Sequence, residues 1–177
     1  MSKFVGWVGA AALSVTVAAA PLSAQIEAGD RSVGVQGLIA TLTGDESFTF
    51  GMGYLSFNKF QTKKFAWRLN AVIQVSDAGD GMETSTGLGG GLEWNFNSEG
   101  LKTIPFVAID AQQFMAKDQN MTMLSPSIGF RSFVSRSTSF DVAVSYNTIV
   151  AGGGDISGGL ILARMGFSYY LGKDPRR

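Results

Sequence analysis

The sequence contains no cysteine and no histidine. Without cysteine the chain forms no disulfide framework and offers no cysteine for lipid attachment. Because histidine is absent, the chain lacks the base of a Ser-His hydrolase, and because cysteine is absent, it lacks a thiol nucleophile. Ser-Lys catalysis requires a buried lysine, and every lysine after residue 24 falls in an expected connection or in the C-terminal tail. We predict that the protein is not an enzyme and has no catalytic residue, metal site or cofactor.

Charged residues are also scarce, at 16% of the chain, against roughly 25% in ordinary soluble domains. Lysine plus arginine equals aspartate plus glutamate, at 14 each. This balance gives no indication of nucleic-acid binding, and we expect none. Glycine is abundant, with 23 residues, as is phenylalanine, with 13. The composition favours tightly packed strands over a helical bundle.

Residues 1–24 have the pattern of a secretory signal peptide. Lys3 precedes an apolar run over residues 4–20, and the small residues Ser23 and Ala24 follow it. We expect cleavage after Ala24; the alternative is an uncleaved membrane anchor. Residues 25–177 then form a single domain, in which no run of about 18 consecutive apolar residues predicts a spanning helix.

Eight later segments alternate between apolar and polar side chains with a period of two, which is typical of β-strands. They span residues 33–42, 48–57, 65–76, 86–96, 104–115, 122–134, 139–150 and 158–171. They are longer than the usual strand of about five to six residues and suit a tilted membrane strand of about 9–11 residues. A sheet in hydrocarbon must close, because open edges leave unpaired backbone groups. We predict an all-β fold, an eight-stranded antiparallel up-and-down transmembrane β-barrel, with the more apolar face of each strand outward.

The apolar face expected for residues 48–57 consists of Phe48, Phe50, Met52 and Tyr54. On the minor face of other segments, six charges lie near mid-strand. An arginine facing lipid near the midplane would cost about 2–4 kcal/mol, whereas charges inside the barrel can pair. We predict a lumenal ion-pair network that fills much of the interior, formed by Arg68, Glu93, Asp110, Arg131, Asp141 and Arg164. Glu93 and Asp141 are expected beside Arg68 and Arg131, and Asp110 beside Arg164.

Gly87, Gly89 and Gly91 lie on the same minor face. Glycines there allow the wall to bend tightly or admit a large side chain from across the lumen. They do not form a phosphate-binding loop, because no Lys-Ser/Thr pair and no helix follow them.

An even number of strands places both chain ends on one side, which is the periplasm for an outer-membrane barrel. Connections on that side carry mostly lysine and arginine, and those on the other side are mostly acidic. Aromatic residues gather near the same rim. We predict a periplasmic-side aromatic girdle of Phe65, Trp67, Trp94, Phe96, Phe106, Phe140 and Tyr169.

The last segment contains Arg164-x-Gly166-x-x-Tyr169-x-Leu171. Together with the signal-like N-terminus, this pattern resembles small Gram-negative outer-membrane β-barrels of the OmpA-transmembrane/OmpX type. The motif is similar to the assembly signal that such proteins present to the barrel-assembly machinery, although here residues 172–177 follow it. The resemblance implies contact with outer-membrane lipid and lipopolysaccharide, passage through that machinery, and a monomer.

Three functions fit this pattern. The first is an outer-membrane barrel with a structural or surface-interaction role. The second is a narrow passive pore for small solutes. The third is a secreted soluble barrel that binds a small apolar ligand inside, with both faces of every strand reversed. The tryptophans near strand ends, and an opposite face rich in Gly, Ser and Asn with few lysines, favour the membrane.

Overall fold

The computed structural model describes residues 26–42, 48–77, 81–96, 101–115, 120–150 and 156–172. The expected signal segment, residues 1–24, lies outside the described residues. Within the described ranges, no helix is long and apolar enough to cross a membrane.

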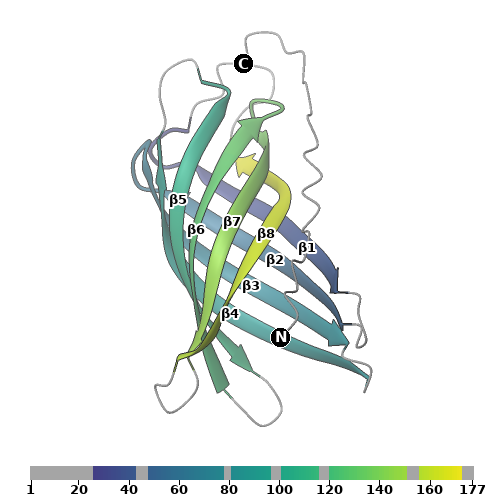
Figure 1. Ribbon diagram of the computed structural model, residues 1–177. Helices are drawn as coiled ribbons and strands as arrows, with labels where there is room; N and C mark the ends of the chain where they lie inside the picture. Colours follow the sequence, from purple (N-terminus) through teal and green to yellow (C-terminus); the bar gives the residue numbers. More distant parts are fainter. Residues whose placement is uncertain are drawn as a thin grey trace, which may run out of the picture.

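Eight strands follow one another along the chain (Figure 1). They are β1 (Arg31–Leu42), β2 (Phe48–Phe60), β3 (Phe65–Asp77), β4 (Met82–Asn95), β5 (Thr103–Met115), β6 (Asn120–Phe133), β7 (Thr138–Val150) and β8 (Ile156–Leu171). Each strand pairs antiparallel with the next, and β8 pairs with β1 to close the barrel. The predicted eight-stranded up-and-down barrel is confirmed, with strand ends within a few residues of those expected.

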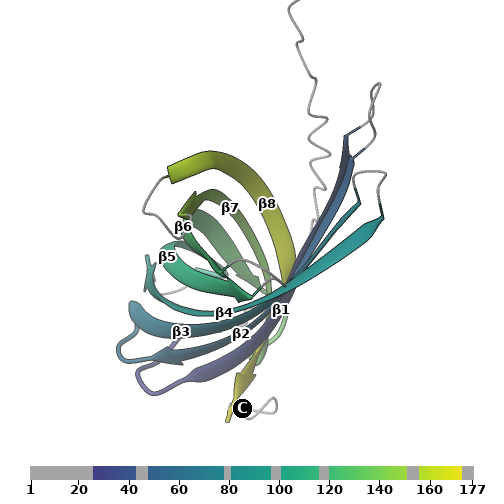
Figure 2. The ribbon, with the colours of Figure 1, turned by 90° about the horizontal axis from the view of Figure 1, so that it is seen from below.

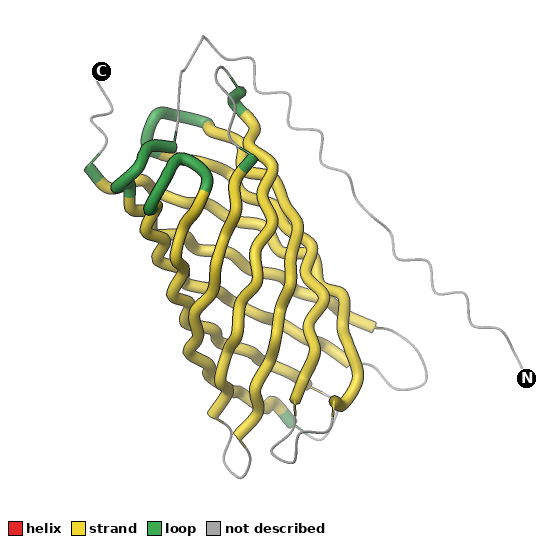
Figure 3. The backbone as a smooth tube through the Cα atoms, turned by 90° about the vertical axis from the view of Figure 1, so that its left-hand side faces the viewer, coloured by secondary structure: helices red, strands yellow, loops and turns green. Residues whose placement is uncertain are grey.

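β2, β4 and β6 finish at the end of the barrel where the described chain begins and finishes (Figure 3). Backbone hydrogen bonds connect neighbouring segments at this end. Phe60 N–H of β2 donates to Asp30 C=O before β1, at 2.9 Å, and Tyr170 N–H of β8 donates to Ser137 C=O before β7, at 2.7 Å. We call this the terminal end and the other the opposite end.

Side chains alternate between the outer wall and the interior, and the register of β7 with β8 shifts once, between Thr148 and Ile149. In β5, all the even-numbered residues from Ile104 to Phe114 are buried, and their odd-numbered neighbours are exposed. The strands surround a common interior (Figure 2), so the side chains of one face of every strand converge there. Large apolar side chains face outward, as with Trp67, Ile128 and Ile161, which are 55%, 65% and 70% exposed.

The expected orientation of β2 is wrong. Phe50, Met52 and Tyr54 are buried in the interior, at 7%, 5% and 5% exposure, while Leu55 faces outward. Residues directly opposite one another in an antiparallel pair share a face, and Tyr54 lies opposite Val72 of β3, which is buried. Phe48 belongs to the same face by register, but its side chain lies outside the described residues.

The glycines of β4 make room for side chains of the neighbouring strand β5. Gly87, Gly89 and Gly91 lie opposite Phe114, Gln112 and Asp110. A Cβ at Gly89 would lie 2.7 Å from the Cγ of Gln112, and one at Gly91 would overlap Asp110 and the carbonyl of Ile109. The β5 side chains therefore lie across the inner face of β4, which only glycine permits at these distances.

Substituting Gly91→Ala should lower the free energy of unfolding by about 1–3 kcal/mol, because the new methyl group has to displace a buried carboxylate and backbone. Chemical unfolding of the purified protein in detergent, followed by tryptophan fluorescence, measures this. The control is Gly53→Ala on β2, where an added Cβ meets nothing within 4 Å. Equal effects of the two substitutions would contradict the packing described here.

Candidate functional site: a layered lumen

Apolar side chains fill the interior at the terminal end. One cluster lies at the strand ends and in the segment before β1: Ile26, Phe60, Ala66, Ile104, Phe133 and Tyr170. The Tyr170 ring centre is 5.9 Å from that of Phe60, in a stacked arrangement, and 5.1 Å from that of Phe133. Five of these six residues are completely buried. We call this group the terminal cluster; it closes the barrel interior at this end.

Arg131 is the centre of the first polar layer above the terminal cluster. Its Nη1 lies 2.9 Å from Glu93 Oε1, and its Nε lies 3.2 Å from Asp141 Oδ1. The guanidinium also lies over the Phe106 ring, 5.3 Å from the centroid. All three charged side chains are at least 98% buried. One cation is therefore shared between two anions and an aromatic face.

The two carboxylates of this layer receive further hydrogen bonds. Ser139 and Ser168 hydroxyls donate to Asp141 at 2.8 and 2.7 Å. The Asn95 amide donates to Glu93 Oε1 at 2.9 Å. A buried carboxylate is tolerated only when its oxygens are paired and hydrogen-bonded, and both carboxylates here satisfy that condition.

A second polar layer lies nearer the middle of the barrel. Arg68 connects the two layers, with Nη1 3.2 Å from Glu93 Oε2 and Nε 3.4 Å from Asp110 Oδ1. Asn70 donates to Asp110 Oδ1 at 2.8 Å. Arg164 Nη2 lies 3.6 Å from Asp110 Oδ2. The structure thus brings all six charges of the predicted network together, in the expected pairs and with Arg68–Asp110 in addition.

A second apolar cluster occupies the lumen toward the opposite end, and sequence reasoning missed it. It consists of Phe50, Met52, Tyr54, Val72, Phe114, Met123 and Leu162. We call it the inner apolar cluster. On each strand, these apolar residues are separated from the inward polar residues by an even number of positions, so both kinds share the inner face. On β5, for example, Phe114 lies on the same face as Asp110 and Gln112. That parity was the signal available in the sequence.

Phe106 does not belong to the aromatic girdle, and this part of the prediction is wrong. It is 1% exposed and lies inside, against Arg131, because it shares the parity of Asp110 on β5. The other six aromatic residues lie on the outer wall, with Trp67, Trp94, Phe96 and Tyr169 about half exposed. Phe65 links two of them, with ring centres 5.9 Å from Trp67 and 6.4 Å from Trp94.

The residues of the predicted assembly signal divide between the two faces of β8. Arg164 is buried in the lumen, while Tyr169 and Leu171 lie on the outer wall, 50% and 43% exposed. Gly166 lies opposite Gln36 of β1. A Cβ at Gly166 would overlap the backbone of Val35 and Gln36, so this glycine permits close contact at the strand pair that closes the barrel.

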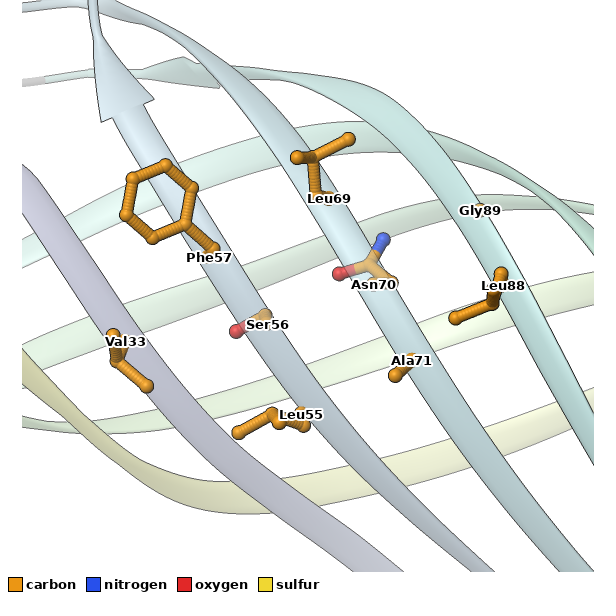
Figure 4. Close-up of a pocket in the computed structure, with 9 residues that line it drawn as sticks. All are labelled: Val33, Leu55, Ser56, Phe57, Leu69, Asn70, Ala71, Leu88 and Gly89. Carbon is orange, nitrogen blue, oxygen red and sulfur yellow. The ribbon is translucent and has the colours of Figure 1, made fainter.

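A shallow groove of about 460 Å³ crosses β1–β4 on the wall (Figure 4). It is lined by Val33, Leu55, Ser56, Phe57, Leu69, Asn70, Ala71, Leu88 and Gly89. Ser56 and Asn70 are buried toward the lumen, so the part facing outward is apolar. The groove presents no group suited to catalysis or metal binding. Among the described residues, no cluster of acidic side chains could hold a metal ion.

No known protein family matches the chain. No curated protein matches it either. Among solved structures, the chain is similar to the outer membrane protein OprG from Pseudomonas aeruginosa, with a TM-score of 0.51 and 14% sequence identity over 84% of this chain and 99% of that one. At this identity the likeness shows the barrel fold alone. Membership of the OmpA-transmembrane/OmpX type stays a prediction.

Replacing Glu93 with Gln should lower the free energy of unfolding by about 3–5 kcal/mol, because Arg68 and Arg131 both lose a buried partner. Denaturant titration in detergent micelles gives this value. Glu83→Gln is the matched control, since Glu83 lies on the same strand but is exposed; its effect should stay within about 0.5 kcal/mol. A small effect for both variants would show that the ion pairs do not stabilise the barrel.

Proposed function

We propose that this chain is an outer-membrane β-barrel protein of a Gram-negative bacterium, with a structural or surface-interaction role and a lumen filled by side chains. The observation that carries the proposal is the apolar outer wall. Large apolar side chains are exposed on all eight strands, and Val35, Leu55, Leu69, Ile128 and Ile161 are all more than half exposed. Such a continuous apolar surface would cause aggregation in water, whereas a bilayer covers it.

The ends of the barrel support the same proposal. Lys59, Lys63 and Lys64 are exposed at the terminal end, next to Trp67 and Trp94 on the wall. Aromatic rings prefer the membrane interface, and cationic side chains beyond them reach the lipid phosphates. In this proposal the terminal end faces the periplasm, and the wall contacts lipid and, in the outer leaflet, lipopolysaccharide.

Biogenesis completes the proposal. A leader ending near Ala24 would export the chain, and the wall-facing Tyr169 and Leu171 of β8 would be read by the barrel-assembly machinery. The similar OprG structure is described as an outer membrane protein, which agrees with this location. We expect a monomer, because β8 pairs with β1 of the same chain, Arg31–Gly37 lying opposite Leu171–Met165, so that the sheet closes on itself there.

The interior argues against the two alternative functions. A passive pore needs a continuous polar path, but the terminal cluster, the ion pairs and the inner apolar cluster follow one another across the lumen. A soluble barrel for an apolar ligand needs an apolar interior and a polar wall. Here Arg68, Glu93 and Arg164 are buried, while Trp67 and Phe167 are more than half exposed.

Cell fractionation tests the location. The protein should stay in the outer-membrane pellet after a carbonate wash, and boiling should shift its mobility on a denaturing gel, because a folded barrel resists detergent until heated. Recovery in the soluble fraction without a mobility shift would refute the membrane assignment.

Planar-bilayer recording tests the filled lumen. Purified protein should give no large, stable channels, because buried side chains occupy the interior at both ends and in the middle. A known porin, reconstituted in parallel, confirms that insertion and recording work. Large, stable single-channel steps from this protein would show that the lumen conducts.

A further inference from the structure

Arg164 is the least compensated charge in the lumen. Arg131 and Arg68 each pair with two carboxylates within 3.4 Å. Arg164 has one, Asp110, at 3.6 Å. Nη2 also donates a long hydrogen bond of 3.4 Å to the Ser127 hydroxyl, and the Tyr54 side chain interacts with the guanidinium. Its Nε and Nη1 make no hydrogen bond to any described residue, although the side chain is 98% buried.

The positive charge of Arg164 is not balanced within its own layer. Asp110 is the carboxylate there, and Arg68 and Asn70 already take its Oδ1. Arg68 also pairs with Glu93, so three cations balance three anions over the whole network, but Arg164 shares its single carboxylate with Arg68. Coulombic attraction favours an additional negative charge beside Arg164, at the end of the network farthest from Asp141.

The surroundings of Arg164 suit a small bound anion. The Tyr54 ring lies against the guanidinium, with its centroid 5.0 Å from Cζ, and belongs to the inner apolar cluster. Gln112, the next inward residue after Asp110 on β5, is 1% exposed, and neither polar atom of its amide has a partner among the described residues. Apolar side chains exclude bulk water here, which strengthens a charge interaction with the free N–H groups.

We propose that the middle layer of the lumen binds a small monovalent anion, of about the size of chloride, with the Nε and Nη1 groups of Arg164 as its principal donors. The anion gives Arg164 a counter-charge that it does not share with Arg68, and it stabilises the folded barrel. This site is independent of the location of the protein, so it goes beyond the proposed function.

An anion-exchange experiment tests the site. The full chain is refolded in zwitterionic detergent in sodium gluconate, whose anion is much larger than chloride, and in mixtures with sodium chloride at constant ionic strength. The unfolding temperature should rise with chloride and then saturate, by a few degrees in total, because a ligand that binds only the folded state stabilises it. An unfolding temperature that is the same in both salts would overturn the proposal and leave water as the partner of Arg164.

Two matched variants show whether the chloride dependence of the unfolding temperature arises at Arg164. Arg164→Gln should lose the chloride dependence, while Lys64→Gln, which removes the same charge from an exposed turn, should retain it. Equal chloride dependence in both variants would place the effect on the surface and overturn the site.

If Arg164→Gln does not fold, a second measurement on the wild-type protein tests the anion site. Wild-type crystals grown in sodium bromide should show an anomalous-scattering peak within hydrogen-bonding distance of Arg164 Nε or Nη1. Peaks confined to the outer surface, an adventitious ion only, would refute the lumenal site.

Discussion

The structure depends on the two-sided geometry of a closed strand ring. Each strand sends alternate side chains to the wall and to the lumen, and pairing of Arg31–Gly37 of β1 with Leu171–Met165 of β8 closes the ring at the terminal end. Once the register is set, the face of every side chain follows. A shift of one residue in any pair would move arginines to the wall and leucines to the lumen. The charges and the apolar wall therefore enforce the same register from opposite sides.

The lumen is organised in layers along the barrel. Apolar clusters occupy both ends, and the ion pairs lie between them. Removing water strengthens the attraction between the charges but also makes each of them costly to leave unpaired. No charge of the network is left unpaired, because the carboxylates are shared. Glu93 and Asp110 each pair with two arginines, and Arg68 connects the two polar layers.

Glycine residues make room for large side chains in the lumen, because they have no side chain of their own. On β4 it allows Asp110, Gln112 and Phe114 of β5 to lie flat over the neighbouring strand, which lets large residues fit a narrow ring. At Gly129 the same relation holds, where an added Cβ would lie 2.7 Å from the ring of Phe106. The large inward side chains can therefore pack in the lumen because glycine lies opposite them on the neighbouring strand.

The sequence by itself determined the number of strands, their approximate limits and the face on which the six mid-strand charges lie, because period-two alternation is a local property of the backbone. The apolar character of Phe106 and of the β2 residues Phe50 to Tyr54 predicts the outer wall, whereas their parity relative to Asp110 and Ser56 places them inside. Only the tertiary structure decided which side chains meet. Arg131 of β6 reaches Glu93 of β4, and Arg164 of β8 reaches Asp110 of β5. Such contacts depend on ring closure, which brings strands distant in the chain within a few ångströms and has no local trace in the residues.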